Sequence, residues 1–289
     1  MTMLSARQQL KRLLSQPGII QACGVGDAGQ AKLVEEAGFP VAYMSGSFVS
    51  FTYGLPDVGY LTLSEMAERA ASITRRIKLP LIADADDGYG AAIAITRTVQ
   101  SYEEAGVAAL HLEDEFPKKF GTLATSESMV THLKAAVAAR KDPDLLIIAR
   151  TDSMRPWRKD LGAGSAEDDC VRRCLAYAEA GADVIMIMSP GSEKALRRFC
   201  REIPRPILLC AGTWDYDPSA AELQALGVKI VIYPVFIRQK IAPLIRSSLR
   251  ELLAAGKVSF SQDEKIQRDT LNNILGMPDY KKIQATFKA

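Results

Sequence analysis

The chain alternates between short, continuously apolar runs and longer segments whose apolar residues recur at helical spacing. One phrase, an amphipathic segment that ends in glycine and leads into an apolar run, occurs four times: EEAGFPVAYMS at 35–45, EEAGVAALHLE at 103–113, AEAGADVIMIM at 178–188 and QALGVKIVIYP at 224–234. Glycine accepts the left-handed conformation that ends many helices, because it has no Cβ to clash. The runs that follow are too continuously apolar for strands with one face in water, and are typical of parallel strands buried on both faces. Each phrase therefore predicts a helix, a turn and a buried strand.

Four further apolar runs bring the predicted strands to eight: 18–24, 79–86, 145–150 and 206–212. Between most pairs of strands lies a helix-length segment, at 62–77, 91–105, 127–140, 165–180, 191–202 and 219–226. Eight alternating β and α units indicate an α/β fold of the (β/α)8 TIM-barrel type. An open, doubly wound sheet is the alternative, because closure is not visible in a sequence.

The segment 235–289 is longer than one barrel helix requires. It predicts a long helix to about Ala255, followed by short helices. Without a low-complexity segment or a clear linker, we expect a single barrel domain over 1–289, with 256–289 as a C-terminal helical extension. Docking of these extra helices on another subunit of a homo-oligomer would explain their presence.

Composition narrows the class of protein. Hydrophobic residues make up 48% and charged residues 24%, which excludes disordered and fibrous chains. Lys and Arg number 36 against 34 Asp and Glu, with no basic block, so neither nucleic acid nor a membrane surface is an expected partner. No apolar run approaches the roughly 20 residues that span a bilayer, and the first residues lack the apolar core of a secretion signal. Five cysteines without a CxxC pair indicate reduced thiols and a cytoplasmic location.

Polar residues gather where the predicted strands end, which is where barrel enzymes carry their chemistry. Asp84 and Asp86 follow one strand and Glu113 follows the next, offering oxygen ligands without imidazole or thiolate. That ligand set suits Mg²⁺ or Mn²⁺, with waters completing the shell. Alternation along a strand would place Asp84 and Asp86 on one face. The alternative is a glycine-rich turn with solvated acids.

The same mouth offers groups for an anionic substrate. Arg150 could clamp a carboxylate bidentately, or form a structural ion pair. The backbone amides around Ser45, Gly46 and Ser47 could hold another carboxylate. Asp57, on a loop after the second strand, is a turn residue or an acid that holds a metal-bound water. His111 lies within a strand and is expected in the core.

These residues make the sequence resemble the phosphoenolpyruvate mutase/isocitrate lyase superfamily. The matching stretches are MSGSFVSFTYGLPDVGYLTLSEM at 44–66, LPLIADADDGYG at 79–90, VAALHLEDEFPKKFG at 107–121, IIARTDS at 147–153, AYAEAGADVIMI at 176–187 and LGMPDY at 275–280. The resemblance implies a barrel whose last helix is swapped between paired subunits, commonly a tetramer of two dimers. It also implies a Mg²⁺ cofactor and a small 2-oxo or 2-hydroxy carboxylic acid as substrate.

The resemblance further implies roles for individual residues. Asp84 would be the most direct Mg²⁺ ligand, with Asp57, Asp86 and Glu113 acting mainly through waters. Ser45, Gly46 and Ser47 would bind the substrate carboxylate, with Tyr43 beside them and Arg150 across the site. Lys118 would be the lysine of the active-site loop. Asp57, Lys118, Arg150 and Tyr43 would form the catalytic set.

Departures from the family's motifs separate the possible reactions. The loop reads Lys118-Lys119-Phe120-Gly121, without the cysteine that serves as acid or base in isocitrate and methylisocitrate lyases, and without the asparagine of phosphonomutases and phosphonopyruvate hydrolases. The glutamate that those lyases carry after the sixth strand is also missing, as is the histidine near the eighth strand of oxaloacetate decarboxylases. Since decarboxylation of a 2-oxo acid needs no base to begin, we predict a Mg²⁺-dependent carbon–carbon lyase most like oxaloacetate decarboxylase. The alternatives are a lyase for 2-methylisocitrate or dimethylmalate, phosphorus–carbon chemistry, and a non-catalytic metabolite-binding barrel.

Overall fold

The computed structural model describes residues 4–116, 122–156, 163–212 and 218–287 of the 289-residue chain. Its eight strands are β1 (Ile20–Val25), β2 (Val41–Met44), β3 (Leu81–Asp84), β4 (Ala109–Glu113), β5 (Leu146–Thr151), β6 (Val184–Ile187), β7 (Ile207–Cys210) and β8 (Ile230–Tyr233). The helices are α1 (Ala6–Ser15), α2 (Ala28–Glu36), α3 (Gly46–Thr52), α4 (Leu63–Thr74), α5 (Ala92–Glu104), α6 (Ser126–Ala139), α7 (Ala163–Glu179), α8 (Glu193–Glu202), α9 (Ala220–Leu226), α10 (Phe236–Ala255), α11 (Gln262–Ile274) and α12 (Met277–Thr286).

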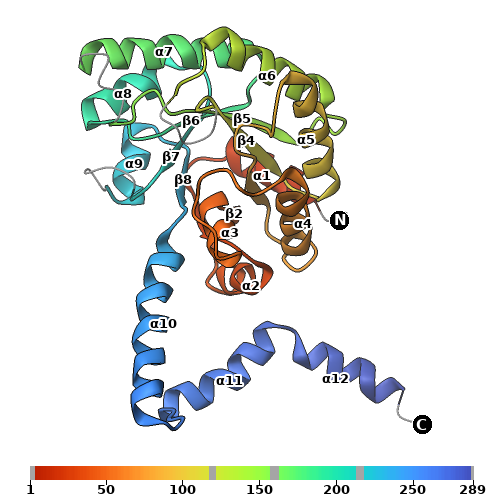
Figure 1. Ribbon diagram of the computed structural model, residues 1–289. Coiled ribbons are helices and arrows are strands. Elements are labelled where there is room, and N and C mark those ends of the chain that lie inside the picture. The colour runs from red at the N-terminus through yellow and green to blue at the C-terminus, as the bar shows by residue number, and fades with distance from the viewer. Residues whose placement is uncertain (1–3, 117–121, 157–162, 213–217, 288–289) are drawn as a thin grey trace.

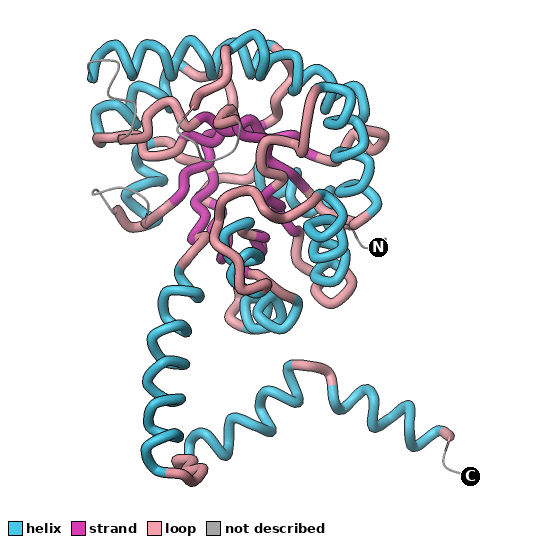
Figure 2. Tube along the Cα trace, in the orientation of Figure 1, coloured by secondary structure: helices cyan, strands magenta, loops and turns pink. Residues whose placement is uncertain are grey.

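The strands form a closed parallel barrel in the order β1 to β8. Closure is direct, because Ile20 of β1 pairs with Ile230 of β8. The predicted TIM barrel is therefore confirmed over the open sheet. Figure 2 shows the strands grouped inside a surround of helices. The four glycines that end the amphipathic segment of the repeated phrase, at 38, 106, 181 and 227, all have φ between 81° and 103°, as the helix-ending role requires.

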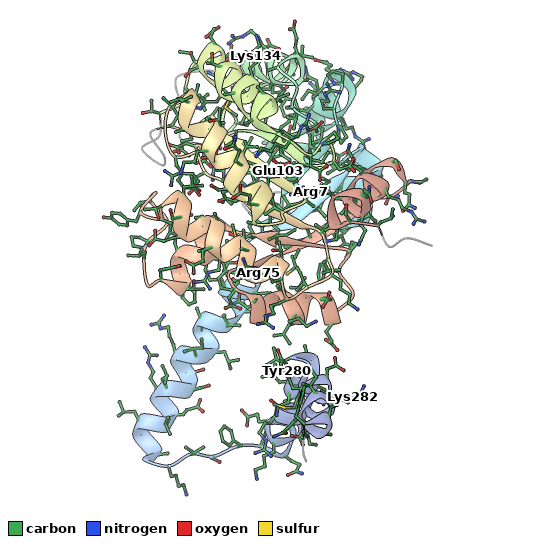
Figure 3. The ribbon with its side chains drawn as sticks, turned by 90° about the vertical axis from the view of Figure 1, so that its right-hand side faces the viewer. Arg7, Arg75, Glu103, Lys134, Tyr280 and Lys282 are labelled. Atoms are coloured by element: carbon green, nitrogen blue, oxygen red, sulfur yellow. The ribbon has the colours of Figure 1, made fainter. Side chains whose placement is uncertain are left out.

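The N-terminal helix closes one end of the barrel. Leu10 of α1 is fully buried among the residues that fill the barrel interior. Arg7 donates hydrogen bonds to the carbonyl oxygens of Val107 and Glu103 and to Asp142 Oδ2, all near the N-terminal ends of strands (Figure 3). The C-terminal end of the barrel is left as the open mouth, where the predicted functional residues lie.

The C-terminal helices leave the barrel. In Figure 1, α10 runs away from the end of β8, and α11 and α12 return below the barrel as a separate arm, on which Figure 3 labels Tyr280 and Lys282. The long helix ends at Ala255, as predicted, with Gly256 in the left-handed conformation. The departure from the barrel begins with α10 itself, and the predicted extension over 256–289 comprises α11 and α12. None of α10, α11 and α12 contains a buried residue.

Because α10 does not cover its own barrel, the outer side of β8 and β1 stays open. A groove of about 450 Å³ lies there, lined by Gln21, Cys23, Phe39, Ala211, Gly212, Tyr233, Val235, Phe236 and Gln239. The arm meets the barrel through α11 and α2, and Arg76 donates to the Tyr280 hydroxyl at 3.3 Å. Among the described residues, no helix is both long and apolar enough to cross a membrane.

Candidate active site

A cavity of about 170 Å³ opens at the C-terminal ends of the strands. Its lining is Tyr43, Ser45, Ser47, Asp57, Asp84, Asp86, Arg150, Arg155, Met186, Met188, Cys210, Pro234, Val235 and Arg238. The fold thus brings together most of the residues predicted from the sequence. Two of the others, Gly46 and Glu113, touch lining residues from behind. Lys118 lies outside the described residues.

Asp84 is held from three sides at the end of β3. Its Oδ2 accepts a hydrogen bond from the Gly46 amide, and its Oδ1 accepts one from the Asp86 amide, each at 3.0 Å. Its carbonyl oxygen accepts a bond from the Tyr102 hydroxyl at 2.8 Å. The Gly46 amide, expected to face a substrate carboxylate, is therefore engaged by Asp84 in this structure.

Gly46 is the point where α3 approaches the acidic side chains. A Cβ at this position would lie 2.7 Å from Asp84 Oδ2 and 3.2 Å from Asp86 Oδ1. Real Cβ atoms do not come as close as 2.7 Å, so any larger residue would displace the carboxylate. The glycine creates a cradle in which backbone and two carboxylates meet.

Asp86 reaches the cavity for a reason other than the one the sequence indicated. Strand β3 ends at Asp84, and Asp86 has φ of 51°, so the two side chains are not related by strand alternation. The bond from the Asp86 amide back to Asp84 Oδ1 turns the chain and aims Asp86 into the mouth. A non-glycine residue in the left-handed region raises the free energy of the folded state by about 1 kcal/mol or more, so the backbone is locally strained at this turn.

The donor set fits a hard divalent cation. Asp84 and Asp86 present carboxylate oxygens to one cavity, and Asp57 lines the same space. Among the described residues, no group of three or more His, Cys, Asp and Glu side chains lies close enough together to hold a metal ion. Two carboxylates with waters completing the shell still suit Mg²⁺, which is often bound through only one or two carboxylates.

Arg150 stands at the centre of a buried charge cluster. Its Nη1 lies 2.6 Å from Glu113 Oε2, and its Nε and Nη2 donate to the two oxygens of Asp152 at 2.8 and 3.0 Å. Burial alone would lower the pKa of Arg150, but the charges of Asp152 and Glu113 raise it well above its ordinary value. Arg150 is thus both the predicted structural ion pair and a cation at the cavity. Glu113, predicted as a water-mediated metal ligand, contacts Arg150.

Tyr43 and His111 form a pair at the floor of the cavity. The Tyr43 hydroxyl lies 2.8 Å from His111 Nε2, and the two rings stack. Burial lowers the pKa of His111 to about 4, so the imidazole is neutral near pH 7. Burial, and then the charge of Asp84, raise the pKa of Tyr43 well above its ordinary value. His111 is buried as expected, yet its Nε2 is only 3.6 Å from Asp84 Oδ1, which places it beside the site.

Sequence reasoning missed part of the lining. Arg155 donates to Asp152 Oδ1 at 2.7 Å, and Arg238 donates to the Ser47 carbonyl oxygen at 3.2 Å. Both residues follow strand ends, by four and five positions, so a wider window at those ends would have included them. The lining residues described here pair three carboxylates with three guanidinium groups, and Met186, Met188, Cys210, Pro234 and Val235 form an apolar wall.

Comparison with known proteins places this site in a family. The family described as phosphoenolpyruvate phosphomutase matches residues 10–253. A 2,3-dimethylmalate lyase of Eubacterium barkeri is 36% identical, over 98% of this chain and 99% of its own length. An oxaloacetate decarboxylase of Pseudomonas fluorescens is 36% identical over 78% of this chain and 77% of its own.

A solved structure of phosphonopyruvate hydrolase in complex with oxalate and Mg²⁺ is similar over 99% of this chain and 100% of its own, with a TM-score of 0.86 and 29% identity. The extent of these matches and the shared barrel agree with the motifs at the strand ends. The chain therefore belongs to the phosphoenolpyruvate mutase/isocitrate lyase superfamily and is an enzyme of its carbon–carbon lyase kind.

Proposed function

We propose that the protein is a Mg²⁺-dependent carbon–carbon lyase that decarboxylates oxaloacetate or a close 2-oxo dicarboxylic acid. The observation that carries this proposal is that Asp84, Asp86 and Arg150 line one cavity of about 170 Å³. Three carboxylates and three guanidinium groups line the cavity, and Glu113 and Asp152 behind them pair with Arg150 and Arg155, so carboxylates are in excess and a dication would be attracted to the site. The small volume favours a short dicarboxylate.

Asp84 and Asp86 would hold Mg²⁺, or Mn²⁺ in its place, with Asp57 and Glu113 acting through waters. The ion, when bound, supplies electrostatic stabilisation for negative charge on a substrate oxygen, an effect typically worth several kcal/mol. Arg150, in the same lining, would bind a substrate carboxylate, and Ser45 and Ser47 offer hydroxyl groups beside Gly46.

Decarboxylation places few demands on the side chains. The C3–C4 bond of oxaloacetate breaks, CO₂ leaves, and C3 takes up one proton to give pyruvate. No base is needed to start this reaction. Tyr43 keeps its proton because of its raised pKa and therefore serves as a hydrogen-bond donor rather than a base. A loop without cysteine, with Phe120 after Lys118 and Lys119, is compatible with this chemistry.

The test is pyruvate formation from oxaloacetate by the purified protein with Mg²⁺. The controls are Mg²⁺ alone and the Asp84→Asn variant, which keeps the size of the side chain and removes its charge. We expect turnover well above the metal-only rate in the parent protein and almost none in the variant. Pyruvate formation at the metal-only rate by the parent protein would refute the proposal.

A second candidate is retro-aldol cleavage of an alkyl-substituted malate. Met186, Met188 and Val235 line the same cavity as the acidic and basic groups, and would accept an alkyl substituent. A relative named 2,3-dimethylmalate lyase supports this candidate. Cleavage would release a 2-oxo acid and a carboxylic acid, and would require Lys118 or a water to remove the hydroxyl proton, because Tyr43 keeps its own proton. Mass spectrometry of products from a panel of 2-hydroxy diacids with Mg²⁺ would separate the two reactions.

We also propose that a second copy of the chain covers the open groove beside β8 and β1, using the exposed apolar face of α10. Leu249, Leu252 and Leu253 lie on one face of α10 and are 59%, 44% and 86% exposed, and an apolar face of this kind at the surface indicates an interaction site. Light scattering should give a homo-oligomer, and a Leu249→Glu, Leu253→Glu variant should shift it toward monomer. An unchanged mass would contradict this assembly.

The free thiols of all five cysteines support a cytoplasmic location.

A further inference from the structure

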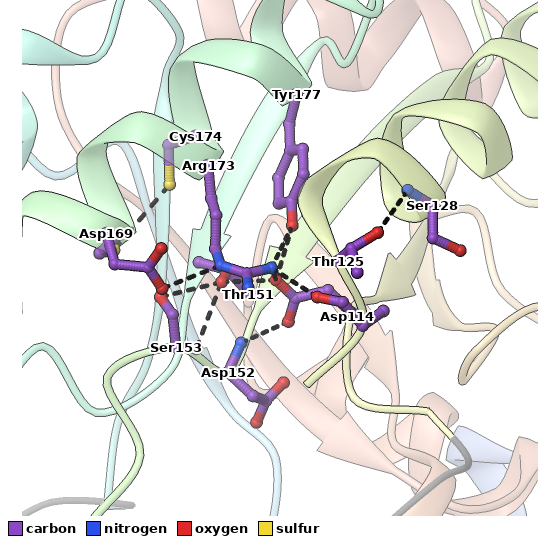
Figure 4. A network of polar contacts seen from close by, with 12 residues as sticks. Asp114, Thr125, Ser128, Thr151, Asp152, Ser153, Asp169, Arg173, Cys174 and Tyr177 are labelled. Carbon is purple, nitrogen blue, oxygen red and sulfur yellow. Dashed lines mark hydrogen bonds and ion pairs between the residues drawn. The ribbon is translucent and has the colours of Figure 1, made fainter. Parts of the chain in front are cut away.

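A second polar network lies behind the cavity, centred on Asp114. This residue directly follows β4, is fully buried, and is surrounded by Tyr177 and Arg173 of α7 and by Thr151 and Asp152 at the end of β5 (Figure 4). Nothing in the proposed reaction uses it. Its contacts nevertheless lead back to the cation that faces the substrate.

Asp114 holds three successive residues of the neighbouring strand end. Its amide donates to the Arg150 carbonyl oxygen at 3.1 Å. Its Oδ1 accepts a hydrogen bond from the Asp152 amide at 2.9 Å, and its Oδ2 accepts one from the Thr151 hydroxyl at 2.8 Å. The backbone pairing of β4 with β5 ends at Glu113 and Arg150. Beyond that point the Asp114 carboxylate, in place of a backbone carbonyl, accepts the hydrogen bond from the Asp152 amide.

The carboxylate of Asp114 is itself fixed. The Tyr177 hydroxyl donates to Oδ2 at 2.8 Å, and Arg173 Nη1 lies 3.5 Å away. Arg173 is in turn anchored by Asp169 Oδ2 at 3.0 Å and by the Ala124 carbonyl oxygen at 2.8 Å. A buried carboxylate with this many partners has one position available to it.

The hold on Asp152 matters because Asp152 grips Arg150. Both Asp152 oxygens accept bonds from the Arg150 guanidinium, in a fork geometry that tolerates little rotation. Any rotation of the Asp152 backbone would move that fork, and with it the face that Arg150 presents to the cavity. The Asp114 carboxylate blocks this rotation through the Asp152 amide.

We propose that Asp114 is a positioning residue for Arg150, acting through the backbone and carboxylate of Asp152. This inference rests on the proposed role of Arg150 in binding a substrate carboxylate. Arg173 and Tyr177 have no direct part in binding, and their function is to fix the Asp114 carboxylate. The network makes the geometry of the substrate clamp depend on α7, on the far side of the strand from the cavity.

The experiment measures binding of oxalate, in the presence of Mg²⁺, by calorimetry, so that it does not depend on which reaction is catalysed. Asp114→Ala removes the acceptor for the Asp152 amide and should weaken oxalate binding about tenfold. Asp114→Asn keeps a carbonyl oxygen that can accept from the Asp152 amide. The hydroxyls of Thr151 and Tyr177 can rotate to accept hydrogen bonds from the new side-chain amide, so this variant should bind oxalate within about threefold of the parent. Asp183→Ala is the matched control, because the Asp183 carboxylate also accepts a hydrogen bond from a β5 amide, that of Ile147 at 2.8 Å, but at the opposite end of the strand, and the variant should leave affinity within twofold.

The same variants are then made in an Arg150→Lys background. If Asp114 acts through Arg150, Asp114→Ala should have less than a twofold effect there, because the fork it positions is gone. If Asp114→Ala does not fold, Tyr177→Phe, which removes one bond to Asp114 without changing shape, should weaken binding about threefold in the parent and not in the lysine background.

Two results would overturn the inference alone: an equal loss in both backgrounds, or no loss in the arginine background. Unchanged oxalate affinity in Arg150→Lys by itself would instead overturn the proposed role of Arg150, and the inference with it. The two failures are therefore distinct.

Discussion

Replacing Gly46 by alanine tests the central arrangement of the site with one methyl group. The added Cβ would lie 2.7 Å from Asp84 Oδ2, about 0.7 Å short of the 3.4 Å at which ordinary contacts begin. Asp84 is short, and both of its oxygens already accept hydrogen bonds from backbone amides, so it cannot swing aside freely. The carboxylate must move or lose one of these bonds.

The effect on stability should be small, because two terms oppose each other. Alanine is favoured over glycine in a helix by about 1 kcal/mol, while a lost hydrogen bond to a charged group costs about 1.5–3 kcal/mol. Metal binding is far less tolerant, since ligand distances must be kept within about 0.2 Å. A carboxylate displaced by several tenths of an ångström should therefore lower Mg²⁺ affinity by about 10- to 100-fold, the range seen when groups that orient metal ligands are altered.

The assay is calorimetric titration of the variant with Mg²⁺, alongside urea unfolding in EDTA. Gly29→Ala is the control, because Gly29 lies in the first turn of α2, and its nearest neighbour would be Asp27 Oδ1 at 3.3 Å, in a helix that contributes nothing to the cavity lining. We expect Gly29→Ala to bind Mg²⁺ like the parent. If Gly46→Ala also binds Mg²⁺ with parental affinity, the metal is not held where Asp84 and Asp86 meet.

Three other outcomes are expected. Asp84→Asn should lose nearly all turnover while unfolding within about 1 kcal/mol of the parent, because an amide cannot balance a dication; wild-type rates would show the metal assignment to be wrong. Arg150→Met leaves the buried Glu113 and Asp152 without their main counter-charge and should cost about 3–5 kcal/mol in urea unfolding, whereas a loss below 1 kcal/mol would mean that water reaches this cluster. Burial lowers the pKa of His111 from 6.5 to about 4. Between these two pH values the folded state therefore binds fewer protons than the unfolded state. The free energy of unfolding should fall by about 3 kcal/mol, from this residue alone, as the pH drops from 6.5 to 4. In EDTA, His111→Gln should remove that part of the pH dependence, and an identical pH profile for variant and parent would contradict it.

The secondary structure and its sequence order could be predicted from the chain alone, because they follow from local physics. A glycine such as Gly106 or Gly181 ends a helix through its own backbone freedom, and a continuously apolar run forms a buried strand wherever it lies. Eight such units predict a barrel, and a barrel gathers its strand ends at one mouth. The strand-end positions of Asp84, Asp86 and Arg150 in the sequence therefore predict that these three side chains share one site.

The pairing of charges within the mouth was decided only by the tertiary structure. Arg238 and the Ser47 carbonyl that it contacts are 191 positions apart in the sequence, and Asp114 and the Asp152 amide are 38 apart. At such separations the pattern of apolar and polar residues does not predict which groups meet. Glu113 contacts Arg150, and Asp86 enters the cavity through a turn with positive φ rather than by strand alternation. The sequence determined which groups stand at the strand ends, since that depends on neighbouring residues. Which group each of them meets depends on how closed strands and loops bring distant segments within hydrogen-bonding distance, and only the folded chain fixes that.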